Sequence, residues 1–267
     1  MNGAILRNTL TYKLALAFRY NFKDFFITLG NIGKDFVRTM HYILMFKFKY
    51  SQIIEQCSRF GVSSLPITLT IVSMTAIIIS MQISPELAKQ GAGDYIGMMS
   101  GLVMIRELSA VMSGFAIISM IGSSYASELA SMSVTEQISA MKVLKVDPIE
   151  YLFLPRVLSG AIMMPFVVVL ASFVGLLFAG IVADMTAGVS MLNYINSLWQ
   201  GLYMKDIWVM LLKSVFFGAT IALVSCSCGY STRGGAKEVG QATTRAVVWS
   251  FVAIAMWDWV FAAVFYL

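Results

Sequence analysis

Four charged residues lie within long apolar stretches of the sequence: Arg106, Glu107, Lys213 and Asp258. A charge at the centre of a membrane-spanning helix costs about 2.5 to 3.5 kcal/mol on insertion scales, so each requires a partner or a polar cavity. Arg106 and Glu107 lie near one end of their stretch, where they can snorkel. Adjacent residues project about 100° apart on a helix, so these two need not pair with each other. Lys213 and Asp258 lie deeper and predict either a structural ion pair between two helices or a functional polar site.

Other kinds of chemistry have no support in the sequence. No G-x-x-x-x-G-K-[ST] loop occurs, so the chain is not expected to bind nucleotide phosphates, and a pump would need energy from another subunit. Ser139 and Lys142 match S-x-x-K, but the other motifs of penicillin-binding enzymes are missing. His41 is the only histidine, which excludes a multi-histidine metal site. We therefore expect no catalytic residue, metal or cofactor in this chain, and ATP would be bound by a partner.

The composition is that of an integral membrane protein. The chain has 267 residues, of which 58% are hydrophobic and only 12% charged. Its mean hydropathy is +0.79, far above that of a soluble domain with a polar exterior. The net charge of +5 could indicate nucleic acid binding in a soluble protein, but in a membrane protein basic residues mark the cytoplasmic face. We therefore expect membrane lipids, and no nucleic acid, as the chain's surroundings.

Stretches of about 20 residues with little or no charge predict membrane-spanning helices. Three stretches are uncharged over at least that length, and two more contain only Lys213 or Asp258 as an internal charge. The fold class is therefore all-α integral membrane, with five transmembrane helices over residues 62–85, 98–126, 157–184, 207–230 and 246–267.

The basic residues predict the orientation of these spans. Nine lysines and arginines precede the first span, and the loops after spans two and four hold most of the others, whereas the opposite side has only Lys89 and Lys205. Because lysine and arginine concentrate in cytoplasmic loops, the N-terminus is expected in the cytoplasm and the C-terminus outside it.

Residues 1–58 form a separate N-terminal segment before the spanning domain of residues 59–267. The segment mixes basic residues with aromatic ones, a pattern typical of an amphipathic helix in the membrane interface. The alternative is a small cytoplasmic helical cap. The aromatic residues are Phe18, Phe22, Phe25, Phe26, Phe36, Tyr42, Phe46 and Phe48.

The loop after span two predicts a short cytoplasmic helix over about residues 133–147. Ser133 and Glu136 match an S-x-x-E capping box, so the helix should start near Val134 and stop before Pro148. Its apolar face would contain Val134, Ile138, Met141 and Leu144. Such a helix could contact a motor ATPase or rest on the membrane, and spacing alone leaves both open.

Small residues recur at helical spacing within spans two and four, and they allow helix backbones to approach closely. The packing positions are Gly114, Gly122, Ala126, Gly218, Ala222 and Gly229. They favour internal packing over an oligomer interface. In span one, Ile79, Ile83 and Leu87 share a face and could line a pocket for acyl chains, or simply pack or face lipid.

The order and spacing of several motifs from about residue 60 to the end resemble the MlaE/YrbE permease family. The motifs are Arg106-Glu107-Leu108, Gly122-Ser123, Ala126-Ser-Glu-Leu129, Val134-Thr-Glu-Gln-Ile138, Val146-Asp-Pro148, Pro155-Arg156, Lys213-Ser-Val215, Gly229-Tyr230 and Gly240-Gln-Ala-Thr-Thr-Arg-Ala-Val-Val248. Two positions depart from the family pattern. Ser109-Ala110 replaces Gly-Pro, which bears on the bend of span two, and Met120 replaces an arginine.

The resemblance implies a homodimeric permease of a lipid ABC transporter in the bacterial inner membrane. Expected partners are a second copy of the chain, a cytoplasmic ATPase, a periplasmic MCE-domain lipid-binding protein and a small STAS-type regulatory protein on the ATPase. The cargo would be lipid, above all phospholipid. By the same resemblance, Arg106, Glu107, Lys213 and Asp258 border the lipid pocket, and Ser133, Thr135, Glu136, Gln137, Lys142 and Asp147 couple to the ATPase.

Two other functions remain open on the sequence. One is a proton-driven secondary transporter with Glu107 and Asp258 as the relay. The absence of an inverted repeat and the odd number of spans weigh against it. The other is a non-transporting membrane anchor for an MCE-like partner.

Overall fold

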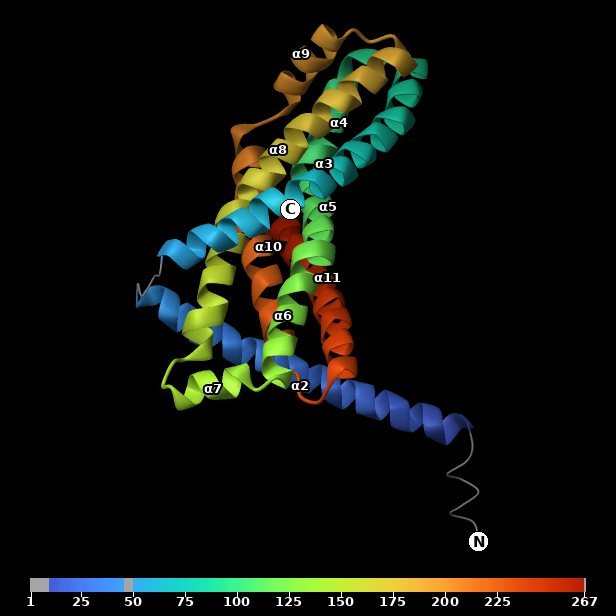
Figure 1. Ribbon diagram of the computed structural model, residues 1–267. Coiled ribbons are helices and arrows are strands. Elements are labelled where there is room, and N and C mark those ends of the chain that lie inside the picture. The colour runs from blue at the N-terminus through green and yellow to red at the C-terminus, as the bar shows by residue number, and fades with distance from the viewer. Residues whose placement is uncertain (1–9, 46–49, 267) are drawn as a thin grey trace.

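A computed structural model describes the backbone of residues 10–45 and 50–266 (Figure 1). It describes side chains for residues 26–45 and 50–266, so the aromatic side chains expected at Phe18, Phe22, Phe25, Phe46 and Phe48 lie outside the described residues. Every regular element in the described part of the chain is helical, which confirms the all-α prediction.

Five helical segments are long and apolar enough to cross a membrane, which confirms the predicted number of spans. The first is α3 (Tyr50–Lys89), the third joins η4 (Ile149–Phe153) to α8 (Leu154–Ala187), the fourth is α10 (Met204–Tyr230) and the fifth is α11 (Ala236–Tyr266). The second, over residues 93–134, consists of η1 (Gly93–Tyr95), α4 (Ile96–Val103), η2 (Met104–Leu108), α5 (Ser109–Ile117), η3 (Ile118–Gly122) and α6 (Ser123–Val134).

The helices extend beyond the predicted spans at several ends. α3 begins at Tyr50, inside the segment expected over residues 1–58, because its first turns are polar and carry no span signal. The short helix α9 (Met191–Gly201) was not expected. Span two is interrupted by η2 and η3, which are turns of π-helix. Such turns insert one extra residue and often mark functional sites.

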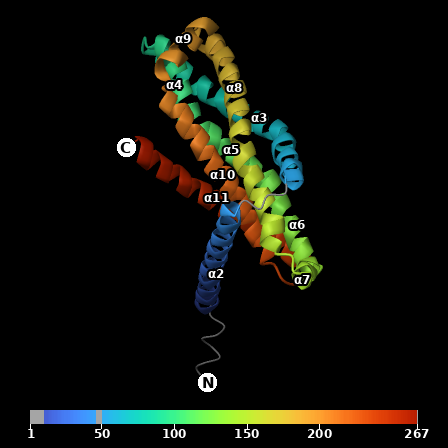
Figure 2. The ribbon, with the colours of Figure 1, turned by 90° about the vertical axis from the view of Figure 1, so that its left-hand side faces the viewer.

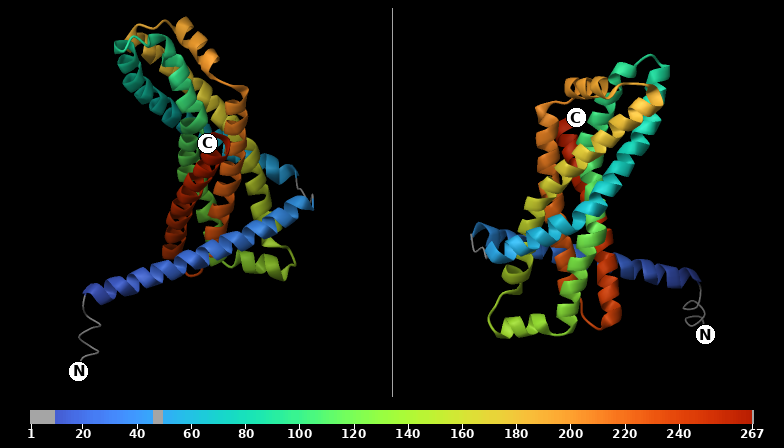
Figure 3. Two further views of the ribbon diagram at one scale, coloured as in Figure 1. Left: turned by 180° about the vertical axis from the view of Figure 1, so that it is seen from behind. Right: turned by 45° about the horizontal axis from the view of Figure 1, so that its top comes forward.

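The two ends of the helix bundle differ in the helices and loops that lie there. The long helix α2 (Leu10–Leu44) crosses the spans near the end where α7 (Gln137–Val143) and the α10–α11 turn lie (Figures 1 and 3). The helix α9 lies at the opposite end, beside α4. Figure 2 shows α11 diverging from the bundle toward the C-terminus. The basic loops predicted to share one side of the membrane therefore lie at one end of the molecule.

The helix expected over residues 133–147 is shorter and begins later than predicted. α6 continues to Val134, and α7 spans only Gln137–Val143. Glu136 lies between them with φ 62°, a left-handed conformation that turns the chain sharply. Lys145 repeats this conformation with φ 58°, two residues after the end of α7. The helix is short because left-handed residues end it on both sides.

The capping box predicted for Ser133 and Glu136 is wrong. No side chain caps α7, and the Ser133 hydroxyl instead donates to the carbonyl oxygen of Thr232 at 2.7 Å. The Ser133 hydroxyl therefore bonds to a carbonyl almost one hundred residues away in the sequence instead of capping the neighbouring helix. This bond ties the end of α6 to the α10–α11 turn.

The helices α8 and α10 approach each other closely where two glycines meet. A Cβ atom on Gly218 would lie 2.1 Å from the Gly160 carbonyl oxygen, and one on Gly160 would lie 2.5 Å from the Gly218 oxygen. Both distances are far below van der Waals contact. Because lipid provides no hydrophobic force between helices, such close backbone contact is a main source of association.

The other small residues predicted for packing also lie at helix contacts. A Cβ on Gly114 would meet Ile254 at 2.8 Å, one on Gly122 would meet the Ser225 hydroxyl at 3.0 Å, and one on Gly229 would meet the Ala126 carbonyl at 2.5 Å. These contacts join span two to spans four and five. Ala222 is fully buried in the core.

We predict that Gly218→Ala destabilises the bundle. The added methyl must push α8 and α10 apart, which should cost about 1 to 3 kcal/mol and lower the apparent Tm in detergent by several degrees. Gly240→Ala is the matched control, since nothing lies within 4 Å of a Cβ there. Equal melting of the two variants would contradict the close α8–α10 contact.

Candidate functional site

The ammonium group of Lys213 is the centre of an ionic cluster between spans two, four and five. The Lys213 side chain is fully buried on α10. Its Nζ donates to Glu107 Oε2 at 2.9 Å, to Asp258 Oδ1 at 2.7 Å and to the Arg106 carbonyl oxygen at 2.9 Å. All three N–H groups of the ammonium therefore have an acceptor, as a buried charge requires.

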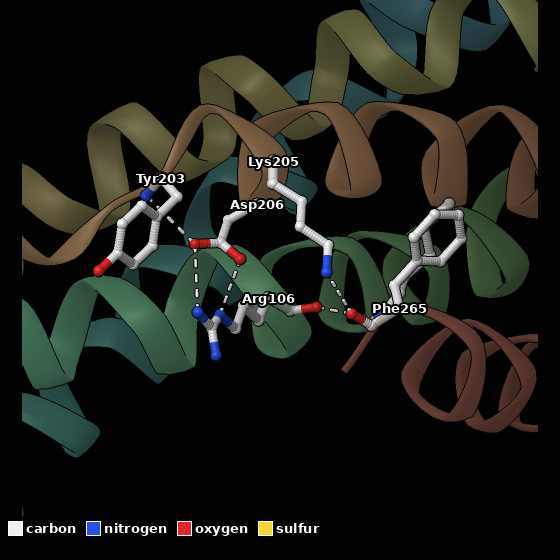
Figure 4. Close-up of polar contacts among 6 residues, drawn as sticks. Arg106, Tyr203, Lys205, Asp206 and Phe265 are labelled. Atoms are coloured by element: carbon white, nitrogen blue, oxygen red, sulfur yellow. Dashed lines mark hydrogen bonds and ion pairs between the residues drawn. The ribbon is translucent and has the colours of Figure 1, made fainter. Parts of the chain in front are cut away.

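Arg106 forms a second ion pair beside the first. Its Nε lies 2.9 Å from Asp206 Oδ1 and its Nη2 lies 3.3 Å from Asp206 Oδ2, a two-pronged contact. Figure 4 shows Asp206 between Arg106 and the backbone N–H of Tyr203, which donates to the same carboxylate at 3.2 Å. The Arg106 guanidinium also lies 4.8 Å from the ring centroid of Tyr266.

The helix geometry explains how the adjacent residues Arg106 and Glu107 reach two different residues of α10. Asp206 and Lys213 are seven residues apart on α10, so they share a face two turns apart. Arg106 and Glu107 lie in the π turn η2, whose extra residue alters the normal 100° step. Arg106 contacts Asp206 and Glu107 contacts Lys213, so both side chains point toward α10.

The cluster contains two cations, Arg106 and Lys213, and three carboxylates, Glu107, Asp206 and Asp258, so its formal charge is +2 − 3 = −1. The side chains of Arg106 and Glu107 remain 34% and 38% exposed, whereas Lys213 and Asp206 are inaccessible. A ligand can therefore contact Arg106 and Glu107 directly, with Asp258 26% exposed beside them, and the buried Lys213 and Asp206 hold these residues in position.

The four charged residues predicted from the sequence thus lie together, and the structure adds Asp206. Sequence reasoning missed Asp206 because it lies one residue before the predicted start of span four, where a charge is unremarkable. Its signal is the seven-residue spacing to Lys213 on the same face. The neighbouring Lys205 does not join the cluster. Its Nζ donates to the Phe265 carbonyl oxygen at 2.6 Å (Figure 4).

The three apolar residues predicted on span one lie half-buried on α3. Leu87 packs against the core cluster that contains Val72, Met104 and Tyr194, which is distinct from the Lys213 cluster. A role for Ile79 and Ile83 in a pocket stays a prediction.

A second ionic cluster joins three spans nearer the α7 end. Glu128 on α6 accepts from Arg59 on α3 and from Arg156 on α8, each at 3.1 Å. Arg156 is buried, donates to the Leu152 carbonyl oxygen at 2.9 Å, and lies 5.3 Å from the Tyr125 ring centroid. Such a network cross-links the spans where the bundle approaches α7.

Asp147 connects the loop after α7 to the helix α2. Its carboxylate accepts from the Tyr42 hydroxyl at 2.6 Å and from the Ile149 backbone N–H at 2.9 Å. The bond to Asp147, together with burial, raises the pKa of Tyr42 to about 12, so the tyrosine stays a donor at neutral pH. This contact joins two segments that are 105 residues apart in the sequence.

The surface of α7 combines polar and apolar exposed residues. Among the predicted coupling residues, Thr135, Glu136, Gln137 and Lys142 are exposed. The predicted apolar face is only partly correct: Ile138 is buried, but Leu144 follows the end of α7 and is 74% exposed. Its neighbour Val143 is 83% exposed, so this loop presents apolar side chains outward.

No group of three or more histidine, cysteine or acidic side chains in the described residues is arranged to hold a metal ion.

Comparison with known proteins identifies the family. Residues 53–264 match the family Permease MlaE. The chain is 33% identical to the probable ABC transporter permease protein slr1045 of Synechocystis over 91% of this chain and 89% of the relative. It is 33% identical to the probable ABC transporter permease protein RP096 of Rickettsia prowazekii over 81% of this chain and 83% of the relative.

A plant protein is also similar. It is TRIGALACTOSYLDIACYLGLYCEROL 1, chloroplastic, of Arabidopsis thaliana, 35% identical over 84% of this chain and 64% of the plant chain. The match over most of the chain, together with five spans and exposed loops at one end, leads to one conclusion: this chain belongs to the MlaE permease family and is a membrane-spanning permease subunit of an ABC transporter.

Proposed function

We propose that this permease moves phospholipid between the bacterial inner membrane and a periplasmic MCE-domain protein, with ATP hydrolysed by a separate subunit. The observation that carries the proposal is the Lys213 cluster, where buried charges support two accessible ones, Arg106 and Glu107, within an apolar bundle. A phospholipid has the matching combination of a charged headgroup and apolar chains.

The residues around the cluster fit such a ligand. Arginine is a common phosphate ligand, and Arg106 donates Nε and Nη2 to Asp206, so its remaining N–H groups on Nη1 could donate to a phosphate. Aromatic side chains of α10 and α11 also pack on one another, with Phe216 lying 5.1 Å from Trp257 and 5.5 Å from Phe261 between ring centroids. The name of the plant relative, which contains that of a galactolipid, also favours a lipid cargo.

The orientation follows from the positive-inside rule. The end with α2, α7 and the α10–α11 turn carries the basic loops, so we place it in the cytoplasm, with the C-terminus in the periplasm. The described part of α2 exposes apolar residues along one side, including Phe36, Val37, Met40 and Leu44. A helix of this type is stable in the membrane interface, with its apolar side among the acyl chains.

Family membership implies an ATPase partner, and it favours an ABC permease over the proton-driven transporter. A second copy, the MCE-domain protein and a STAS-type regulator are further proposed partners. We place the ATPase at the end of α7, because Val143 and Leu144 expose apolar side chains on a cytoplasmic loop. Exposed apolar side chains of this kind mark surfaces that a partner protein covers.

We predict that Glu107→Gln lowers ATP-dependent lipid transfer about tenfold, which corresponds to about 1.4 kcal/mol. The amide cannot balance the charge of Lys213 or receive a headgroup cation. Transfer should be measured with labelled phospholipid in proteoliposomes that contain the assembled complex. Glu86→Gln is the control, since Glu86 is an exposed glutamate on α3 outside the cluster. Unchanged transfer in an assembled Glu107→Gln complex would remove Glu107 from the site.

A second prediction concerns the ATPase contact. Leu144→Glu should strongly reduce co-purification of the ATPase, because a charge would replace an apolar side chain that the partner buries. Leu192→Glu is the matched control, as Leu192 is 70% exposed on α9 at the opposite end. If both variants retain the ATPase equally, the contact lies elsewhere.

A further inference from the structure

A wide polar groove lies between α2, α7 and the turn from α10 to α11. Its volume is about 770 Å³, within the range of sites that hold small ligands. Four cationic side chains line it: Lys34 and Arg38 from α2, Lys142 from α7 and Arg233 from the turn. The groove is thus built by three segments that are far apart in the sequence.

The four cations have no carboxylate within ion-pair distance among the described residues. Lys142 has a different contact, with its Nζ 5.2 Å from the Tyr230 ring centroid. Of the two acidic residues that line the groove, Glu136 is exposed, and Asp35 is buried and accepts from the Ser227 hydroxyl at 2.7 Å. Burial raises the pKa of Asp35. The groove therefore carries excess positive charge.

The position of the groove relative to α2 points to the membrane surface. Arg38 directly follows Val37, which is 67% exposed, and adjacent residues project about 100° apart on a helix. The cations on α2 therefore border its exposed apolar side. If that side enters the acyl region, Lys34 and Arg38 lie at the level of the lipid headgroups, where basic side chains attract anionic lipid.

The groove differs from the apolar surface at which we place the ATPase. Ser133, Glu136 and Lys142, which the family resemblance assigns to coupling, line the groove, whereas the exposed Val143 and Leu144 do not. The two surfaces of the α7 segment thus differ in chemistry as well as in direction. An apolar protein contact fits the second surface, and an anionic headgroup fits the first.

We propose that this groove binds the phosphodiester headgroup of an anionic phospholipid of the cytoplasmic leaflet, as a site separate from the one for transported lipid. The inference rests on the proposed placement of α2 at the membrane surface. Lys213 and Tyr230 are 17 residues apart on α10, which places the Lys213 cluster roughly 26 Å from the groove at 1.5 Å per residue. A headgroup in the groove would bridge α2 and α7, so anionic lipid would stabilise the α7 loop in its coupled position.

The test measures how much phosphatidylglycerol the full chain retains after extraction from vesicles of phosphatidylglycerol and phosphatidylcholine, by native mass spectrometry. Arg38→Gln combined with Arg233→Gln should reduce bound phosphatidylglycerol roughly tenfold or more and leave phosphatidylcholine unchanged. Lys237→Gln combined with Arg245→Gln is the control, because it removes the same charge from residues that line a different cleft. The control variant should retain phosphatidylglycerol as the unmodified chain does.

Several outcomes would overturn the proposal. Equal loss in both double variants would mean that net charge alone attracts the lipid. Displacement by glycerol phosphate at the same concentration as phosphatidylglycerol would assign the groove to a free phosphate compound. Unchanged lipid, with loss of the ATPase when the same variant is co-purified with it, would assign the groove to a protein contact. Lipid transfer by the Glu107→Gln complex and phosphatidylglycerol retention by the Arg38→Gln, Arg233→Gln variant are separate readouts, so failure of the transport proposal can be distinguished from failure of this one.

Discussion

The ammonium group of Lys213 has to find three acceptors inside the bundle, since neither lipid nor water reaches it. Those acceptors come from spans two and five, so the burial of one charge fixes three helices relative to one another. Removing one partner of a buried ion pair typically costs about 3 to 5 kcal/mol. The π turn at η2 persists because it directs Glu107 to Lys213 and Arg106 to Asp206.

The remaining contacts follow from the same scarcity of polar partners in lipid. Serine and threonine hydroxyls in the spans return to carbonyls of the preceding turn, as Ser64 does to Phe60 at 2.7 Å and Thr68 to Ser64 at 2.8 Å. Helices then associate through close backbone approach, as at Gly160 and Gly218. Charged side chains of the spans gather in two ionic clusters, one around Lys213 and one around Glu128 nearer α7.

The spans were predictable because the length of an uncharged stretch is a property of the local sequence. The partners of Lys213 were only partly predictable. Pairing with Asp258 was one of two alternatives, and the 100° step assumed for Arg106 and Glu107 does not hold in a π turn. The capping box failed for a related reason, since the Ser133 hydroxyl bonds to a carbonyl in a distant turn. A local pattern of a few residues cannot reveal a hydrogen-bond partner that lies far away in the sequence.

The helix α10 contacts every part of the molecule that the function requires. Near its end, Ser227 bonds to Asp35 of α2, and Tyr230 lies under Lys142 of α7. Farther along, it packs on α8, and then Lys213 holds the site that reaches spans two and five. A continuous helix transmits displacement along its axis with little internal change. If the ATPase docks at α7 as proposed, α10 is the continuous helix that connects α7 to the Lys213 cluster, and it is held against α8 by the close contact of Gly160 and Gly218.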